Sequence, residues 1–413
     1  MAYAGSRLTA ACLRSIGLDA RVAPDSDART LDLGGLHTSG EECLPHKVTI
    51  GDFLKICQAP GFDPARTAFL MPTAHGPCRF GQYAPYLRQL LDRMGWHEAM
   101  VFSPTSANGY EDFGRSGRGL IRQMWMALVF GDLATRMLLR TRPYEREAGS
   151  ADAAFEESVR DGCEVFARPG LTARQRLEAA VQAVRRMGRR FREVPAEYRR
   201  GRPLIGLVGE IFCRHNTFSN DDTARRIERL GGECWLSDIA EWVWYTNWYQ
   251  RGLILQARGR FSLAMLKWWV KTRVQRTYEH VLAGPLAEEL AGLEEPRHIE
   301  EVLALAEPYL PPRGAIGEMV LSAGRAVYLY RKGADGVLDI SPFTCMNGIV
   351  CEAVYPAISR DHDDLPIRTL YFDGVNTSID RDLEIFLDLA RAYQRRKRHP
   401  RVYPACFGDS PAA

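Results

Sequence analysis

Three of the ten cysteines stand in sequence contexts that could do chemistry. They are Cys43 in residues 41–45 (EECLP), Cys78 in residues 75–81 (HGPCRFG) and Cys345 in residues 342–348 (PFTCMNG). Glycine and proline near a cysteine let the backbone approach a bulky inorganic group and donate N–H to its sulfides. Cys43 directly precedes a predicted helix, whose N-terminus stabilises a thiolate, and Arg79 beside Cys78 would do the same.

The spacing of the cysteines excludes the common local metal motifs. There is no C-x-x-C, and the closest pair, Cys345 and Cys351, is six residues apart. A zinc ribbon, a ferredoxin run and a thioredoxin motif therefore cannot form locally. In a reducing cytosol disulfides are not expected, and most of the cysteines would be small buried hydrophobes. Two interpretations of the three loops stay open: a shared metal site, or structural cysteines.

The N-terminal elements that would position Cys43 and Cys78 alternate between helix and strand. We predict strands at residues 67–72 and 99–103, and helices at 45–57 and 80–94. This alternation favours a doubly wound α/β unit, and residues 24–40 are predicted to be loop.

The chain opens with a predicted helix at 7–16 where such a unit normally has a strand. We expect this helix to pack on a parallel sheet that begins with strand 20–23. That sheet would have an open edge, which favours association with another chain.

The predicted secondary structure changes twice after residue 108. Helical periodicity at 119–138 and 172–194 predicts a helical insertion, and alternation then returns with four candidate strands at 204–208, 233–236, 336–340 and 367–372. The expected fold class is α/β, with two doubly wound parallel-sheet domains and a helical insertion. The expected boundaries are 1–108, 109–200, 201–400 and a frayed tail at 401–413. Open α/β sheets bind ligands at the carboxyl ends of their strands, where Cys78 and Cys345 fall.

Composition limits the classes of partner. The 413 residues are 46% hydrophobic and 25% charged, as in a globular protein, and 54 basic against 51 acidic residues give a net charge of +3. This charge does not imply a nucleic-acid partner. No apolar run of about 18 residues occurs, and Met1 to Ala11 lacks a signal peptide, so we expect a cytoplasmic protein without a membrane partner.

Four segments carry a family resemblance. They are residues 42–52 (ECLPHKVTIGD), 71–83 (MPTAHGPCRFGQY), 209–220 (GEIFCRHNTFSN) and 342–348 (PFTCMNG). Together they resemble the proteins related to 2-hydroxyacyl-CoA dehydratase subunits, and in particular the dehydratase-like region fused to long CoA-substrate-specific activases. The resemblance runs from about residue 6 to about residue 395. One departure is C-M-N-G at 345–348 where C-M-P-G is expected.

The resemblance implies a 4Fe-4S cluster at the interface of the two α/β domains, held by Cys43, Cys78 and Cys345. One iron would have no protein thiolate and could take substrate oxygen, water or another sulfur. In the family an ATP-hydrolysing activase injects a low-potential electron, which the dehydratase uses to form a ketyl radical and expel hydroxide. This sequence has no P-loop and no actin-like phosphate-binding run, so the activase would be a separate chain.

Other residues have a functional and a structural interpretation. Cys351 and Cys213 could be further cluster ligands or packed core residues. Glu210 and Arg214, one helical turn apart, could line the crevice or form a structural ion pair. His75 could contact substrate or cluster, or stabilise its own loop.

Two longer segments are similarly open. The aromatic residues between 242 and 269 could be core or a wall facing a partner or substrate, and the arginine-rich segments at 185–202 and 395–401 could be solvated faces or docking sites for an acidic partner or a CoA phosphate. The expected function is the cluster-binding component of an ATP-dependent reductase or dehydratase-like system. The alternatives are a non-catalytic iron-sulfur electron-transfer or cluster-carrying subunit, and a structural paralogue with zinc or no metal. A homo- or hetero-oligomer is expected, and the substrate is open.

Overall fold

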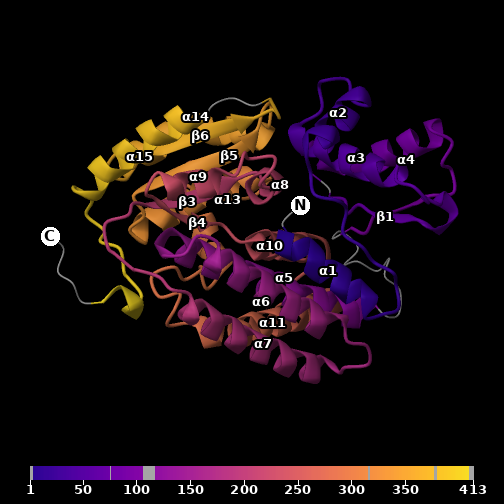
Figure 1. The fold of residues 1–413 in the computed structure, drawn as a ribbon, viewed down its shortest axis with the longest axis horizontal. Helices are drawn as coiled ribbons and strands as arrows, with labels where there is room; N and C mark the ends of the chain where they lie inside the picture. The colour runs from indigo at the N-terminus through magenta and orange to yellow at the C-terminus, as the bar shows by residue number, and fades with distance from the viewer. Residues whose placement is uncertain (1–2, 75, 106–116, 315–316, 376–378, 409–413) are drawn as a thin grey trace.

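The computed structural model describes residues 3–74, 76–105, 117–314, 317–375 and 379–408. Helices and parallel sheets are combined in one chain, as the predicted α/β class requires (Figure 1). Short 3-10 helices lie at Pro64–Arg66, Arg79–Gln82 (η2), Arg142–Tyr144, Gly284–Leu286 and Ala405–Phe407. No helix of the described ranges is both long and apolar enough to cross a membrane.

The C-terminal part of the chain is built on a four-stranded parallel sheet. Its strands are β3 (Leu204–Gly209), β4 (Glu233–Leu236), β5 (Gly336–Pro342) and β6 (Ile367–Phe372). β3 and β5 are buried along their whole length, and burial on both faces explains the continuous apolar run of β3. The order is β4-β3-β5-β6. The connection after β3 leads to β4 on one side of β3, and the connection after β4 crosses to β5 on the other side. The crevice beyond the carboxyl ends of β3 and β5 is therefore the topological switch point, where such sheets bind ligands.

Helices cover both faces of this sheet (Figure 1). One face packs on α9 (Thr223–Arg229) and α15 (Asp380–Gln394), through a core that includes Ile205 and Leu207 of β3. The other packs on α13 (Glu318–Arg331) and α14 (Met346–Asp361), through a core that includes Leu204 and Val208. Alternate residues of one strand thus enter opposite cores, as a strand's period of two requires.

The N-terminal unit is smaller than predicted. Its sheet has two short parallel strands, β1 (Ala68–Leu70) and β2 (Met100–Phe102), with helices α2 (Ala28–Leu36), α3 (Leu44–Cys57) and α4 (Tyr83–Arg93). The prediction of a strand at 20–23 was wrong, because these residues are exposed or half-exposed and bury no apolar face. Within the described residues this unit is therefore not a doubly wound sheet.

Helix α2 lies where a loop was predicted. Asp27 and Thr30 form a reciprocal capping box that starts the helix. Two glycines then let α2 lie directly on α3. A Cβ on Gly34 would stand 2.2 Å from the Lys47 carbonyl oxygen, and one on Gly51 would stand 1.9 Å from that of Thr30. The glycines that weaken the helical pattern in the sequence are the residues that make this close packing possible.

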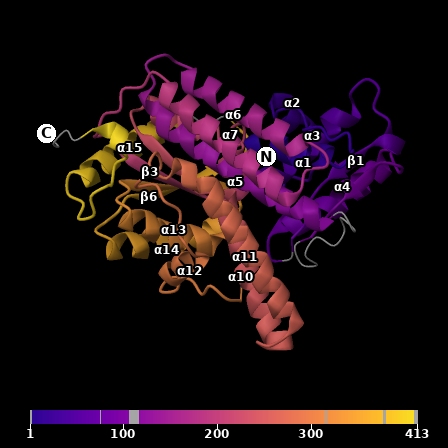
Figure 2. The same ribbon diagram turned by 90° about the horizontal axis from the view of Figure 1, so that it is seen from below.

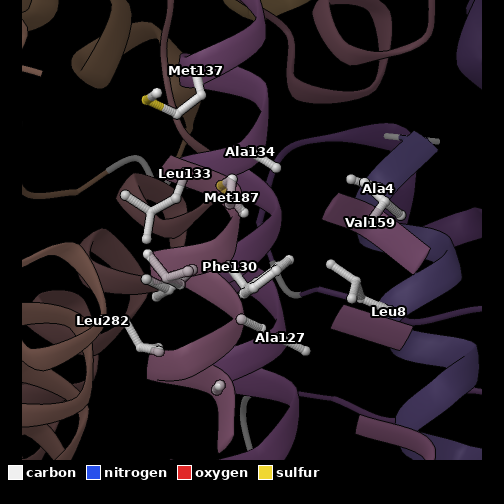
Figure 3. Packing of buried hydrophobic residues seen from close by; sticks show 14 of the residues in the cluster. Ala4, Leu8, Ala127, Phe130, Leu133, Ala134, Met137, Val159, Met187 and Leu282 are labelled. Carbon is white, nitrogen blue, oxygen red and sulfur yellow. The ribbon is translucent and has the colours of Figure 1, made fainter. Parts of the chain in front are cut away.

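A helical unit separates the two sheets in the sequence. It contains α5 (Gly117–Thr141), α6 (Ser150–Ala167) and α7 (Ala173–Glu193), as predicted for the insertion. Helix α1 (Tyr3–Arg14) joins this unit and not a parallel sheet, because Leu8 packs with Phe130 and Val159 in the same core (Figure 3). The first helix therefore does not belong with the α/β unit predicted over residues 1–108.

The remaining helices follow β3 and β4. They are α8 (Ile211–His215), α10 (Ile239–Arg258), α11 (Leu263–Ala283) and α12 (Ile299–Ala306). Helices α10 and α11 form a hairpin that projects from the body (Figure 2).

The predicted frayed tail is packed as far as residue 408. The buried Arg401 guanidinium donates to the Glu233 carboxylate at 2.9 Å, and Phe407 is buried against Tyr144. The reason is that Glu233 lies on a fully buried strand and needs a cationic partner.

Candidate cysteine site

All three candidate cysteines occupy the same local position, the N-cap of a helix. Cys43 caps α3, Cys78 caps η2 and Cys345 caps α14, each with extended backbone angles. The Cys78 sulfur accepts a weak hydrogen bond from Phe80 N–H at 3.5 Å, and backbone N–H groups at the start of α3 and α14 also act on the sulfurs of Cys43 and Cys345. Each sulfur therefore stands next to the free N–H groups and positive end of a helical turn, which favour a negative ligand.

Arg79 connects the loops that carry the three cysteines. It follows Cys78 directly, and its guanidinium donates to the carbonyl oxygen of Glu41 in the Cys43 loop. Its other terminal nitrogen donates to the carbonyl oxygen of Thr344 at 2.8 Å, directly before Cys345. Arg79 and Thr344 lie 265 positions apart in the sequence and are joined directly by this bond. The same bond joins the N-terminal unit to the C-terminal sheet unit.

The turn before Cys345 has an unusual backbone. Thr344 has a φ of +63°, a left-handed conformation that is costly for a β-branched residue. This conformation puts the Thr344 carbonyl within reach of Arg79 and lets α14 start at the next residue but one. Strain of this kind persists where surrounding contacts impose it, and it is common at functional sites.

A buried layer of rings supports Cys43. The Cys43 sulfur and the Tyr83 hydroxyl are 2.8 Å apart. The His46 ring stacks on the Tyr83 ring, with centroids 4.4 Å apart. Burial lowers the pKa of His46 to about 4, so this imidazole is neutral at physiological pH. The sequence analysis did not single out Tyr83 or His46, although both lie inside the segments that carry the family resemblance.

Burial governs the protonation of the two enclosed thiols. It raises the pKa of the buried Cys345 to about 12, and it also raises the pKa of the half-buried Cys43. Arg79 acts in the opposite direction on Cys43, as do backbone N–H groups on all three sulfurs, but their effects are smaller. Burial thus opposes the expected thiolates at Cys43 and Cys345, and binding of a metal would have to displace the protons of these thiols.

A half-buried carboxyl group, Glu210, and a buried one, Glu318, lie at the switch point. Glu210 follows β3 and accepts from the N–H groups of Phe212 and Cys213, at 3.0 and 2.7 Å. Glu318, at the start of α13, accepts from Ile211 N–H at 2.9 Å. Burial, together with the charge of Glu210, raises the pKa of Glu318 to about 8. A carboxyl group that holds its proton at neutral pH can donate it.

Arg214 has a backbone role. Its guanidinium donates to the carbonyl oxygen of Gly209 at 2.7 Å and to that of Asp238 at 3.4 Å, and not to the Glu210 carboxylate. The ion pair considered for these two residues is therefore not formed. Arg214 instead holds the chain where β3 ends. Gly209 has a φ of +108°, and a Cβ there would stand 2.3 Å from the Ile340 carbonyl oxygen, so only glycine fits this turn.

The two further cysteines considered as ligands lie in hydrophobic cores. Cys213 is fully buried, with its sulfur 3.9 Å from the Ser219 carbonyl oxygen. The sulfur of Cys351, in the core between the sheet and α13, donates to the Met319 carbonyl oxygen at 3.4 Å. His75 lies outside the described residues. The structure therefore leaves Cys43, Cys78 and Cys345 as the cysteines of the switch-point loops.

The three cysteines can be compared with the ligands that an iron-sulfur cluster needs. In the parts of the chain that the structure describes, no three or more His, Cys, Asp or Glu side chains are grouped closely enough for one metal ion. A cubane is bound at separate iron atoms, so its thiolates stand farther apart than those around a single ion. The loops of the three thiols are joined by the Arg79 guanidinium, which donates to the carbonyl oxygens of Glu41 and Thr344. Cysteine thiols are the donors that iron-sulfur clusters use, so the chemistry of the donor set is compatible with such a cluster.

Comparison of the chain with family models, curated proteins and solved structures finds no match.

Proposed function

We propose that this chain is the cluster-binding component of an ATP-dependent reductase or 2-hydroxyacyl-CoA dehydratase-like system. Cys43, Cys78 and Cys345 would hold one 4Fe-4S cluster, and a separate ATP-hydrolysing activase would supply its electrons. The observation that carries the proposal is the Arg79 guanidinium, which binds the Glu41 and Thr344 carbonyl oxygens and so gathers three cysteine-capped helices. A purely structural set of cysteines does not need this arrangement.

The surrounding residues have roles that follow from their contacts. A cluster bound here supplies one-electron chemistry and an iron that no protein thiolate occupies. Arg79 places a positive charge beside the site and fixes its loops. Tyr83 orients the Cys43 sulfur, and the N–H groups at the start of α14 can donate to sulfide. Glu318 holds a proton behind the site that a departing hydroxide could accept.

The number of available thiols favours a reactive site over a pure electron carrier. A carrier cluster has four protein ligands, whereas Cys213 and Cys351, the nearest further candidates, are committed to cores. An iron with no protein ligand is what substrate binding requires. The same count favours one cubane over two joined ones, which would need six thiolates.

The decisive experiment is anaerobic reconstitution followed by iron and sulfide quantification and EPR. Wild-type protein should contain about four irons and about four sulfides per chain. Cys43→Ser, Cys78→Ser and Cys345→Ser should each lose most of the iron. Cys406→Ser is the matched control for the exposed Cys78, and Cys163→Ser is the control for the half-buried Cys43. Full iron in all three site variants would overturn the assignment.

A second measurement separates the reductase function from the cluster itself. The isolated chain should not hydrolyse ATP, and reduction of its cluster should need an activase together with ATP. Turnover of ATP by rigorously purified chain would contradict the proposal. An EPR signal unchanged by external ligands would indicate a four-ligand carrier site.

A further inference from the structure

The four-stranded sheet has two edges, and the chain covers only one of them well. β4 forms one edge, where all four of its residues are buried and α5 packs against the strand. β6 forms the other edge, and four of its six residues are only half-buried. The open edge that the sequence analysis expected at residues 20–23 is found instead at β6.

The outer side of β6 carries backbone groups without a partner. The carbonyl oxygen of Phe372 accepts from the N–H group of Phe343 at 2.8 Å, so the even-numbered residues of β6 bond toward β5. Because the bonding direction alternates along a strand, Ile367, Thr369 and Tyr371 direct their N–H and C=O groups outward. Among the described residues, no backbone group bonds to these outward groups. An unpaired edge of this kind is a template for another strand.

Helix α15 borders this edge on one face of the sheet. Arg368 of β6 pairs with Asp382 of α15 at 2.7 Å, so the side of α15 that carries Asp382 lies along β6. Ile385 and Leu389 follow Asp382 at i+3 and i+7 and share its side of the helix. Their side chains are 46% and 54% exposed. They extend the edge of the sheet as an exposed apolar strip.

Helix α14 borders the edge on the other face of the sheet. The Glu352 carboxylate of α14 accepts from the Tyr371 hydroxyl of β6 at 2.7 Å, so this side of α14 lies along β6. Ile349, three residues earlier and on the same side of the helix, is 53% exposed. Exposed apolar side chains therefore flank the unpaired backbone of β6 on both faces, and such a surface marks an interaction site.

The outward groups of β6 are arranged symmetrically about Thr369, which makes the edge complementary to itself. In an antiparallel pair centred on Thr369, Ile367 of each copy lies opposite Tyr371 of the other, and every outward N–H and C=O group of the three residues is paired. Cross-strand pairs of an aromatic with a β-branched residue are favourable. The single charged residue of β6, Arg368, already pairs with Asp382 within the chain, so it needs no anion from outside.

We propose that β6 pairs antiparallel with β6 of a second copy about a twofold axis at Thr369, which joins the two four-stranded sheets into one. The exposed strips of α14 and α15 from the two copies then meet on the two faces of the joined sheet. A twofold contact of this kind uses the same surface on both copies, so it closes a dimer and leaves β6 with no open edge. This inference is independent of the cysteine site.

Sedimentation equilibrium of the full chain, purified anaerobically, tests whether this surface associates. Wild type should dimerise, and Leu389→Asp should raise the dissociation constant roughly 100-fold, since each of the two symmetric contacts loses about tenfold. Because Leu389 is more than half exposed, the variant should keep the helix content of wild type in circular dichroism. Leu253→Asp is the matched control, because Leu253 is 51% exposed on the projecting hairpin (Figure 2), and it should dimerise like wild type.

Cysteine cross-linking tests the register. Directly opposed residues of an antiparallel pair have Cα atoms about 4.5–5.5 Å apart, within the range of a disulfide. Under mild oxidation Thr369→Cys should therefore link to its own counterpart, as mapped by mass spectrometry, and Ile367→Cys should link to Tyr371→Cys only when the two variants are mixed. Leu253→Cys is the control and should not link. A monomeric wild type, a Leu389→Asp variant that dimerises as tightly as wild type, or a Thr369→Cys dimer without this link would overturn the proposal.

Discussion

Arg79 offers the sharpest test of how the cysteine site is held together. Replacing it with Gln removes the donors to the Glu41 and Thr344 carbonyl oxygens and the positive charge beside Cys43. A net hydrogen bond contributes about 0.5–1.5 kcal/mol, and an exposed donor such as Arg79 falls in the lower half of that range. Losing both bonds should destabilise the gathered loops by about 1–2 kcal/mol, which is roughly a 5- to 30-fold change in equilibrium.

Two measurements would detect this change. In reconstituted protein, Arg79→Gln should lose iron to a chelator roughly 5- to 30-fold faster than wild type. Arg79→Lys should lose iron at an intermediate rate, because lysine keeps the positive charge but lacks the planar guanidinium that donates to two carbonyl oxygens at once. In cluster-free protein, amide hydrogen exchange should accelerate around Cys345, whose N–H donates to the Pro342 carbonyl oxygen. Arg381→Gln, at an exposed position on α15, is the control. Wild-type rates in both measurements would refute the role assigned to Arg79.

Two further predictions concern the stability of the fold. Arg325→Met should lower the free energy of unfolding by about 3–5 kcal/mol in a urea titration, because the fully buried guanidinium pairs with Glu295 at 2.6 Å and its loss strands that charge; a loss below about 1 kcal/mol would contradict this. Burial raises the pKa of Glu279 from 4.5 to about 7. The contribution that the neutral carboxyl group makes to the free energy of unfolding is therefore fully present below pH 4.5 and is lost as the pH rises through 7. Glu279→Gln keeps an acceptor for Trp244 and should gain about 1–3 kcal/mol over wild type at pH 8 but little at pH 4.5; parallel pH profiles would argue against it.

The elements that sequence predicts well here are those whose signal is local. Strand β3 lies in the centre of a parallel sheet, so its residues are apolar throughout and the pattern is plain, and β5 beside it is apolar except for Asp339 and Ser341. Helix α2 was missed because Gly34 lowers helix propensity, while its compensation, close contact with the Lys47 backbone, is made across two helices. Helix α1 was recognised as a helix but given the wrong neighbour, since periodicity defines an apolar face without naming what covers it.

The same distinction applies to the cysteine site. The loop contexts of Cys43, Cys78 and Cys345 could be read from glycine, proline and the neighbouring strands, and the structure places all three at helix N-caps. The protonation of the thiols could not be read, because it depends on burial by residues distant in sequence. Arg79 was recognised as a nearby charge, whereas its bond to Thr344 depends on a left-handed turn that no local residue signals.

The position of Arg79 also suggests why the site is divided between two units of the chain. Cys78 and Arg79 belong to the N-terminal unit, whereas Thr344 and Cys345 follow β5 of the C-terminal sheet. Any movement between the units would break the bond at 2.8 Å and separate the Cys345 thiol from the other two. If the three cysteines hold a cluster as proposed, the site is complete only when both units are in place, so the cluster and the unit interface should stabilise each other. Binding that requires the closed arrangement adds its free energy to that arrangement.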